Sequence, residues 1–317
     1  MTTTPGAVRT LSPFEAAREA ARHTRSRLFP IRLGTWFVLG FLAFLDQLGR
    51  TTPWGGGGGA GGGEGRDKGG REALELVERA AGPDGRWSGD VVTAINSALA
   101  WLSAHATLVI LGGLAALLLG AALVAAVLWI NARGTFMYLD AVTSGRVEVR
   151  RPWREHARRA DSYFGWSLGI VAGALLPLGV GVAVAVAVAI AYAQGRLSVP
   201  GGVGVLLALV PLAAVLFLVL PLLFLARIAL RDFVAPIQLA TGVPCGEAVR
   251  VFETLLLAHP GAFALYLLLK VVLWVGTGIV VILGGCLTCC VGFLPIVMQT
   301  LFQPLFYFER AWSVFLL

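Results

Sequence analysis

Six long apolar runs constrain this chain more than any other feature of its sequence. A bilayer core of roughly 30 Å is crossed by a helix of about 20 mainly apolar residues. Because lipid offers the backbone no hydrogen-bond partners, each run is expected to be a helix. The sequence therefore predicts an all-α polytopic membrane protein with six transmembrane helices, at residues 31–48, 105–130, 167–192, 203–227, 262–283 and about 293–312.

The composition excludes a water-soluble globular protein. Of the 317 residues, 57% are hydrophobic and 14% are charged, against roughly 45–50% and about 25% in soluble domains. In a membrane protein, the net charge of +7 favours basic segments on the cytoplasmic face rather than nucleic-acid binding. We therefore expect contacts with membrane lipids and no nucleic-acid partner.

Basic residues orient the predicted helices. Most Lys and Arg residues fall in segments that are cytoplasmic when the N-terminus lies inside. Most of the others lie in one long outer loop, where the positive-inside rule has least weight. Lys occurs only as Lys68 and Lys270, a bias that we associate with the codon usage of a GC-rich bacterium. The prediction is a bacterial inner (plasma) membrane protein with both termini in the cytoplasm.

The predicted topology divides the chain into four parts. Residues 1–30 are expected to form a cytoplasmic amphipathic helix, 31–48 the first span, 49–104 an outer Gly-rich loop with a short helix, and 105–317 the five-helix remainder of a single membrane domain. The Gly-rich loop lacks the Gly-Lys-Ser/Thr sequence and the preceding strand of a phosphate-binding loop. We interpret it as a flexible linker and expect no cofactor.

Three segments that are predicted to face the cytoplasm begin alike, at Pro13, Pro152 and Pro244. Each has Pro where a helix would start, a carboxylate in the first turn and Arg three residues after that carboxylate. Each then leads into an apolar run, so the unit is one amphipathic helix followed by two spans. Because two spans restore the orientation of the chain, the copies would form a threefold parallel repeat. Chance similarity is the alternative, since Glu-x-x-Arg is a common pattern.

Several stretches resemble known bacterial families. A Pro-led helix that feeds a span resembles multi-pass families of unknown function related to the membrane domain of glycerophosphodiester phosphodiesterases. A closer resemblance, to an uncharacterised bacterial membrane family (a domain of unknown function), is carried by the Gly-rich loop and by residues 133–140, 152–154, 231–234, 259–261 and 286–290. It covers nearly the whole chain and implies six helices in an inner membrane. It implies no chemistry, because the catalytic barrel of the phosphodiesterases is absent from this sequence.

Lys270 is the one basic residue well inside a predicted span. An ionisable residue at that depth is a candidate functional residue, as a counter-ion for a substrate or part of a proton relay. Alternatively, its long stem carries the ammonium group to the cytoplasmic interface, next to Tyr266. We favour this second interpretation because Asp46 is expected toward the opposite face and Glu309 near the cytoplasmic end, which leaves no acidic partner at the depth of Lys270.

Three glycines are predicted to pack helices together. Gly165, Gly169 and Gly173 repeat every four residues, a stripe of small residues that lets helices approach closely. Residues 165–169 also match the Gly-x-Ser-x-Gly pattern of a nucleophile elbow. That pattern requires a strand-to-helix turn, whereas here it opens a predicted transmembrane helix, so we favour packing over catalysis.

Cys286, Cys289 and Cys290 lie near the outer turn between the last two predicted spans. We expect them to fill a tight hairpin as small apolar residues. A disulfide is the main alternative, because the periplasm is oxidising. No histidine or carboxylate neighbours these cysteines, so no metal site is expected.

The function that these features favour is non-enzymatic. The amphipathic cytoplasmic helices would form a basic surface against anionic headgroups and a docking site for a protein partner or a second copy of the chain. The densest basic patch consists of Arg150, Arg151, Arg154, Arg158 and Arg159. The alternative is a transporter or channel for a small or lipid-like solute, with Lys270 and Pro-kinked spans along its path. A closed core would favour the scaffold, and charged residues along a continuous path would favour the transporter.

Overall fold

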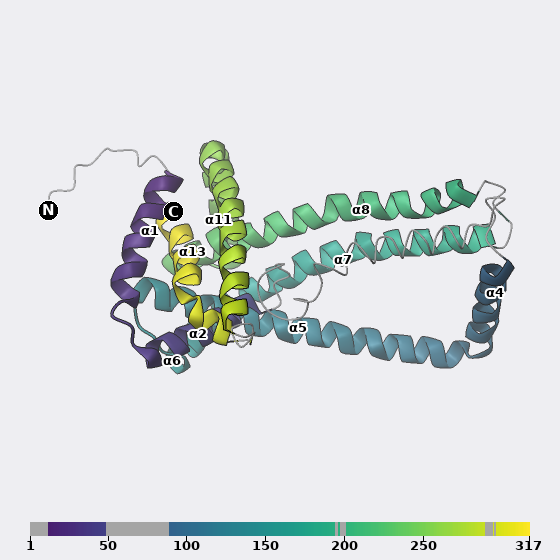
Figure 1. Ribbon diagram of the computed structural model, residues 1–317, viewed down its shortest axis with the longest axis horizontal. Helices are drawn as coiled ribbons and strands as arrows, with labels where there is room; N and C mark the ends of the chain where they lie inside the picture. Colours follow the sequence, from purple (N-terminus) through teal and green to yellow (C-terminus); the bar gives the residue numbers. More distant parts are fainter. Residues whose placement is uncertain (1–11, 49–88, 194–195, 197–200, 289–293, 295) are drawn as a thin grey trace. The chain divides into compact units, whose positions relative to one another are not determined.

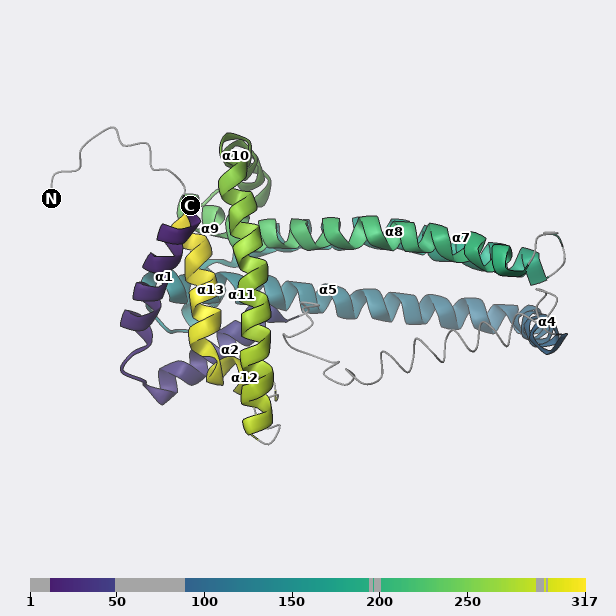
Figure 2. The same ribbon diagram turned by 45° about the horizontal axis from the view of Figure 1, so that its top comes forward.

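The computed structural model describes residues 12–48, 89–193, 196, 201–288, 294 and 296–317. Every regular element in these ranges is a helix (Figure 1, Figure 2), as the predicted all-α class requires. In chain order the elements are α1 (Pro13–Leu28), α2 (Leu33–Gln47), α4 (Gly89–Ala104), α5 (Ala106–Ser144), α6 (Arg150–Glu155), α7 (Ala157–Ala193), α8 (Gly201–Ala229), the π-helix η1 (Leu230–Val234), α9 (Ala235–Thr241), α10 (Cys245–Ala258), α11 (Pro260–Leu287), α12 (Val297–Leu301) and α13 (Gln303–Leu316).

Four helical segments in the described ranges are long and apolar enough to cross a membrane. They match the second to fifth predicted spans and comprise Ala106–Ser144, Ala157–Val188, Leu209–Thr241 and Pro260–Leu287. The first predicted span corresponds to α2, an apolar helix of 15 residues. The sixth falls partly outside the described residues and then on α12 and α13, which are separate helices that meet at Phe302. The structure thus supports a membrane-embedded protein with four candidate spans.

The chain is grouped into two compact units. Unit 1 contains the described residues of 1–58, 126–167 and 227–317, and unit 2 contains those of 59–125 and 168–226. The boundaries fall inside α5, α7 and α8, so each of these helices contributes residues to both units. The predicted division at residues 30, 48 and 104 cuts the chain into consecutive segments, whereas each unit combines segments that are far apart in the sequence. The predicted division stays a prediction.

Unit 2 contains strongly apolar stretches of α5, α7 and α8. In this unit α7 and α8 lie side by side, and Gly181 of α7 faces Leu212 and Val215 of α8. Most large apolar side chains of these stretches are exposed in the single chain. Lipid tails are as apolar as leucine, so such a surface is compatible with a bilayer. Pro177 lies inside α7, and Pro211 and Pro221 lie inside α8.

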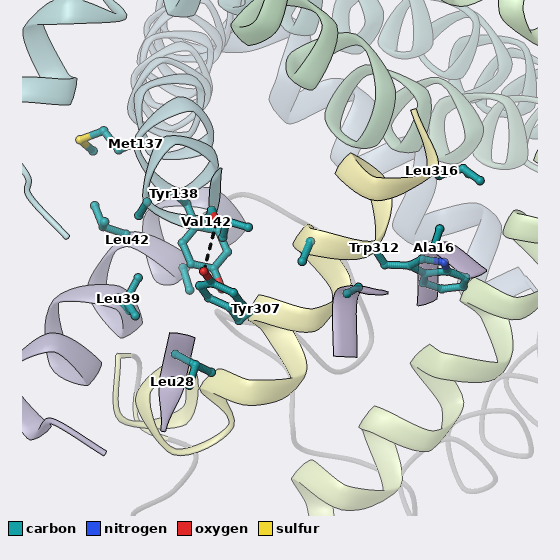
Figure 3. Close-up of a cluster of buried hydrophobic side chains, with 14 of the residues drawn as sticks. Ala16, Leu28, Leu39, Leu42, Met137, Tyr138, Val142, Tyr307, Trp312 and Leu316 are labelled. Atoms are coloured by element: carbon teal, nitrogen blue, oxygen red, sulfur yellow. Dashed lines mark hydrogen bonds between the residues drawn. The ribbon is translucent and has the colours of Figure 1, made fainter. Parts of the chain in front are cut away.

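Unit 1 has a core built around α1, α2, α13 and the C-terminal part of α5 (Figure 3). Trp312 of α13 is buried near Ala16 of α1, and its indole donates a hydrogen bond to the Pro13 carbonyl at 2.9 Å. The Tyr307 hydroxyl of α13 donates to the Val142 carbonyl of α5 at 3.2 Å. The C-terminal helix is therefore fastened both to the start of α1 and to the end of α5.

The apolar face of α1 is used inside the protein. Ala16, Ala20 and Leu28 are buried. The opposite side of the helix exposes Arg18, Arg22 and Arg25. Helix α1 thus has a buried apolar side and an exposed basic side, and because α13 covers the apolar side, the basic side faces outward.

The three predicted repeat segments differ in detail. Helix α1 begins at Pro13, and its N-cap residue Ser12 accepts a hydrogen bond from the Glu15 backbone N–H at 3.4 Å. Pro152, in contrast, is the third residue of the six-residue helix α6, and Pro244 is the residue before α10. Pro therefore opens the helix in one segment of the three. The threefold repeat stays a prediction.

Candidate functional site

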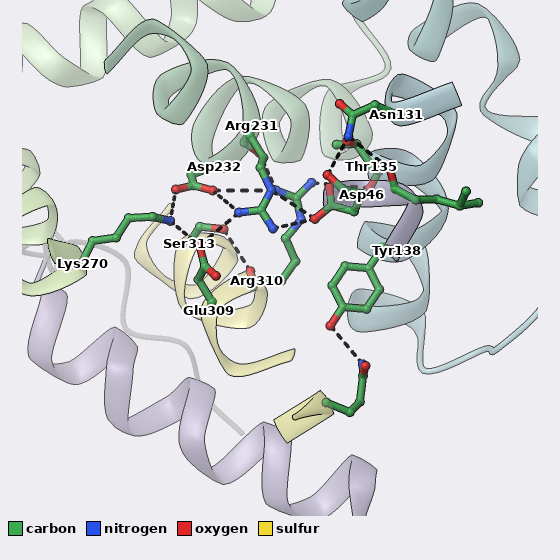
Figure 4. A network of polar contacts seen from close by, with 12 residues as sticks. Asp46, Asn131, Thr135, Tyr138, Arg231, Asp232, Lys270, Glu309, Arg310 and Ser313 are labelled. Carbon is green, nitrogen blue, oxygen red and sulfur yellow. Dashed lines mark hydrogen bonds and ion pairs between the residues drawn. The ribbon is translucent and has the colours of Figure 1, made fainter. Parts of the chain in front are cut away.

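Unit 1 buries a group of charged side chains that come from four elements. The group, which we name the charge cluster, consists of Asp46 on α2, Arg231 and Asp232 on η1, Lys270 on α11, and Glu309 and Arg310 on α13 (Figure 4). All six residues are at most 7% exposed. Charged side chains are almost never buried to this extent unless they are paired.

Arg231 lies at the centre of the charge cluster. Its guanidinium donates to Asp46 Oδ2 from both Nη2 (2.5 Å) and Nε (3.1 Å). Its Nη1 atom donates to Glu309 Oε1 at 3.1 Å and to Asp232 Oδ1 at 3.3 Å. The planar fork of donors that arginine presents suits this role. One cation thus contacts all three carboxylates and links η1 to α2 and α13.

Lys270 occupies another end of the charge cluster. Its ammonium group donates to Asp232 Oδ2 and lies 3.0 Å from Glu309 Oε1. The Tyr266 hydroxyl donates to the same Asp232 oxygen at 3.1 Å, and the Trp274 indole donates to Glu309 Oε1 at 3.3 Å. The expectation that Lys270 lacks an acidic partner and extends to the interface is therefore wrong. Packing against η1 and α13 brings two carboxylates to a side chain that is 1% exposed.

Arg310 and Asn131 fasten the charge cluster to the backbone. Arg310 Nη1 donates to the Arg231 carbonyl at 2.6 Å and lies 3.9 Å from Asp232 Oδ1. The Asn131 amide of α5 donates to the Asp46 carbonyl at 2.7 Å. Carbonyl groups near the C-terminus of a helix lack partners within that helix, so the second bond satisfies an acceptor at the end of α2. The cluster is thereby also connected to α5.

The π-helix η1 carries two consecutive residues of the charge cluster, Arg231 and Asp232. It lies between α8 and α9, and all five of its residues are buried. Adjacent side chains of a regular α-helix point about 100° apart, so one of two neighbours usually faces away from a buried site. Single π-turns widen a helix locally and are frequent at functional sites. In this chain both Arg231 and Asp232 lie in the π-turn, within a run of consecutive buried residues from 230 to 238.

The charge cluster is electrically balanced. Three carboxylates face three cations, and each member has an opposite charge within 3.9 Å. Moving a charge out of water costs several kcal/mol, which is recovered only when the partners are close and well oriented. Arranged in this way, the cluster can hold α2, η1, α11 and α13 in one register.

The predicted basic patch is largely at the surface. Four of its five arginines are exposed, namely Arg150, Arg151 and Arg154 on α6 and Arg158 on α7. The fifth, Arg159, donates from Nη1 to His156 Nδ1 at 2.9 Å. Burial lowers the pKa of His156 from its ordinary value of 6.5, and this shift is opposed by the negative charge of Asp140 and reinforced by Arg159. His156 is therefore part of the local packing, whereas the other four arginines are exposed.

The predicted glycine stripe does not pack against another helix within the described residues. A Cβ atom added at Gly165, Gly169 or Gly173 would meet nothing within 4 Å. A Cβ atom added at Gly134 of α5, in contrast, would lie 2.5 Å from the backbone of Leu45 on α2. The sequence predicted a close approach of helices at the glycines of α7. The structure has such an approach between α5 and α2, at Gly134.

The cysteine and serine motifs form no site in the described part of the chain. Residues 165–169 lie inside α7, so the strand-to-helix turn of a nucleophile elbow does not occur there. No group of three or more His, Cys, Asp or Glu side chains among the described residues could hold a metal ion. Cys286 is exposed. Cys289 and Cys290 lie outside the described residues, so their packing and the disulfide alternative stay open.

Sequence reasoning missed most of the charge cluster. Arg231 was expected in a cytoplasmic segment, because hydropathy places a charge that flanks an apolar run at the membrane surface. Arg310 was counted as cytoplasmic at the end of the sixth predicted span. The signal that could have found them is the occurrence of adjacent opposite charges in apolar surroundings. Arg231 is followed by Asp232, and Glu309 is followed by Arg310 inside the sixth predicted span.

Comparisons with known proteins give a family and no chemistry. Neither the functionally curated proteins nor the solved structures contain a match. Similarity to glycerophosphodiester phosphodiesterases is not shown by the comparisons. One family model matches residues 11–317, a range that includes the whole charge cluster. The chain therefore belongs to the Family of unknown function (DUF7544).

Proposed function

We propose that this chain is a non-enzymatic integral membrane protein that serves as a membrane scaffold or partner-docking protein. The observation that carries the proposal is the charge balance of the charge cluster, in which the chain's own carboxylates and cations neutralise one another. Apolar contact selects no particular helix partner in lipid, because lipid tails are equally apolar. Buried polar groups can instead fix the register between helices. A core of this kind supports a rigid framework rather than a solute path.

The proposed location is a bacterial inner (plasma) membrane, with six spans, both termini in the cytoplasm and three parallel repeats. The four long apolar helices support membrane embedding. The two further spans would come from α2 and from the region of α12 and α13. Distant kinship with the membrane domain of glycerophosphodiester phosphodiesterases belongs to the same proposal. Anionic headgroups are the proposed lipid partners, and a protein partner or a second copy of the chain would use the same basic surface.

Labelling of single cysteines in intact cells tests this topology. Gly145 and Gly242 have φ angles of 72° and 76°, which a cysteine would adopt only with strain. The exposed residues Arg146 and Glu247 are better positions. In a chain whose four native cysteines are replaced by serine, an impermeant maleimide should label neither Arg146→Cys nor Glu247→Cys. It should label a cysteine at Gly59, which lies outside the described residues. Labelling of Arg146→Cys would exclude the proposed orientation.

A transporter or channel for a small or lipid-like solute is the second candidate function. The observation that favours it is the position of Arg231, Asp232 and Lys270 within segments of membrane-spanning length. Ionisable residues inside a membrane are functional candidates by default, because they are costly to place there. On this alternative the charge cluster would exchange partners during transport instead of staying locked.

A flux measurement on the full chain in sealed liposomes separates the two candidates. If the chain is a scaffold, proton and potassium gradients should dissipate as slowly as in protein-free liposomes. Faster dissipation would support the transporter. If the double variant Lys270→Met/Glu309→Gln, which removes one charge of each sign, then abolished the flux while retaining its helical circular dichroism, the path would be assigned to the charge cluster.

A further inference from the structure

The outward side of α6 forms a shallow hollow in the surface of unit 1. The hollow is lined by Glu148, Val149, Arg150, Arg151 and Arg154. Pro152, in the middle of the same short helix, is buried and anchors it to the protein. Three guanidinium groups therefore share one small part of the surface, and none of them belongs to the charge cluster.

The described residues leave positive charge in this hollow. Arg151 Nε donates to Glu155 Oε2 at 3.2 Å, which pairs one of the three cations. The carboxylate of Glu148 also lines the hollow, so three arginines face two carboxylates and a net charge of +1 is left. Arg150 and Arg154 make no hydrogen bond or ion pair with a side chain of any described residue. They are four positions apart on one helix, so their side chains are neighbours and their like charges repel. An anion held between them would remove this repulsion.

Contacts between α6 and α5 place the hollow at the boundary of an apolar stretch. The Trp153 ring packs edge-on against Trp129, with centroids 5.7 Å apart, and Arg133 Nη1 donates to the Trp153 carbonyl at 3.2 Å. Trp129 and Arg133 lie where the apolar run 106–130 gives way to polar sequence. Tryptophan is enriched at the membrane–water interface, at the level of the headgroups. In a bilayer that covers this run, the arginines of α6 lie at headgroup depth.

We infer that Arg150, Arg151 and Arg154 form a seat for the phosphate group of one anionic phospholipid. Guanidinium groups bind phosphate oxygens through paired, charge-assisted hydrogen bonds. Val149 lines the same hollow, and the partly exposed Trp129 lies behind α6, so apolar surface is available to the rest of the lipid. The inference rests on the proposed membrane function and deepens it. It names one lipid site and excludes Arg158 and Arg159, which do not line the hollow.

Retention of phosphatidylglycerol by the purified full chain, measured by native mass spectrometry after detergent exchange, tests this seat. The variant is Arg150→Gln/Arg154→Gln. The matched control is Arg146→Gln/Arg158→Gln, which removes the same charge from two exposed arginines outside the hollow. Loss of hydrogen bonds to a charged group should weaken retention by about tenfold or more in the first variant. The control should retain the lipid as the wild type does.

Other outcomes overturn the inference. Equal losses in both variants would mean that the lipid responds to net charge alone, and no loss in either would mean that the hollow is not the site. Displacement of the lipid by millimolar inorganic phosphate, or equal retention of phosphatidylcholine, would show that the hollow does not select an anionic phospholipid. The flux measurement is independent of these results. A transporting chain that still loses its lipid only in Arg150→Gln/Arg154→Gln would refute the scaffold and leave the seat intact.

Discussion

The two units of this chain differ in how their helices bury charged and apolar side chains. In unit 2, none of the described residues of α5 or α8 is buried, and these stretches are almost entirely apolar. In unit 1, the helices α2, η1, α11 and α13 enclose six charged residues that contact one another. Composition alone is sufficient for the first kind of helix, since lipid accepts any apolar surface. The second kind needs particular partners, so unit 1 should be sensitive to substitutions that unit 2 tolerates.

Arg231→Met is expected to have the largest effect. Methionine retains much of the apolar stem but leaves Asp46, Asp232 and Glu309 with two cations among them. Breaking a buried ionic group in this way costs roughly 3–5 kcal/mol. Thermal unfolding of the purified full chain in detergent measures the loss. Arg227→Met, four residues earlier and outside the charge cluster, is the control, and equal losses in the two variants would break the comparison between the units.

Lys270→Met is expected to follow, with a loss of roughly 3 kcal/mol. It removes a cation that contacts two buried carboxylates, Asp232 and Glu309. Adding Glu309→Gln restores electrical balance, so the double variant should be more stable than the sum of the two single effects predicts. A double-mutant cycle measures this coupling. Strict additivity would mean that charge balance does not stabilise unit 1.

Gly134→Ala is expected to cost about 1–3 kcal/mol, because the new methyl group would press on the backbone of Leu45 and force a shift of α2 or α5. The matched control is Gly113→Ala on the same helix, in unit 2, where a Cβ atom would meet nothing within 4 Å. Alanine is a better helix former than glycine by up to about 1 kcal/mol. The control should therefore be neutral or slightly stabilising, and melting temperatures that fall together would contradict the difference between the units.

A dependence on pH near His156 is the smallest of the expected effects. Burial lowers the pKa of this imidazole, so the folded protein favours its neutral form. Its contribution to stability is fully present above 6.5 and is lost as the pH falls from there toward the lower pKa of the folded state. The melting temperature should fall between about pH 7.5 and about pH 5.5, and less so in His156→Gln. Parallel curves for the two proteins would assign the change to other groups.

The four long apolar helices could be predicted because insertion in lipid depends on the composition of a single segment. The environment of Lys270 could not be predicted in this way. Its partner Asp232 lies 38 positions away, and which carboxylate meets a given cation depends on how the helices pack. Asp232 lies outside the predicted spans and was not considered as a partner, which left Lys270 without one.

The C-terminal end of α5 could not be predicted from the sequence either. The apolar run ends at residue 130, but the helix continues to Ser144. The continuation contains buried polar residues such as Asn131 and Arg133. A hydropathy profile ends the predicted span at such residues. The helix continues because α2 and α6 supply carbonyl acceptors for their side chains. Segment ends and polar burial therefore required the tertiary structure.

The π-turn at η1 also changes the direction in which the side chains after it point, relative to those before it. A π-turn contains one residue more than an α-turn, so every residue after it is rotated by about 100° relative to an uninterrupted α-helix. Helix α9, in which Ala235, Pro236 and Ile237 are buried, follows directly after this turn. In a relative that lacks this one residue, the residues on either side of it would be rotated relative to one another, and the contacts of Arg231 and Asp232 would change. Some relatives are expected to lack one residue between Arg227 and Ala235. In these relatives the charge that pairs with Asp232 (Lys270 here) or with Arg231 (Glu309 here) should also be lost.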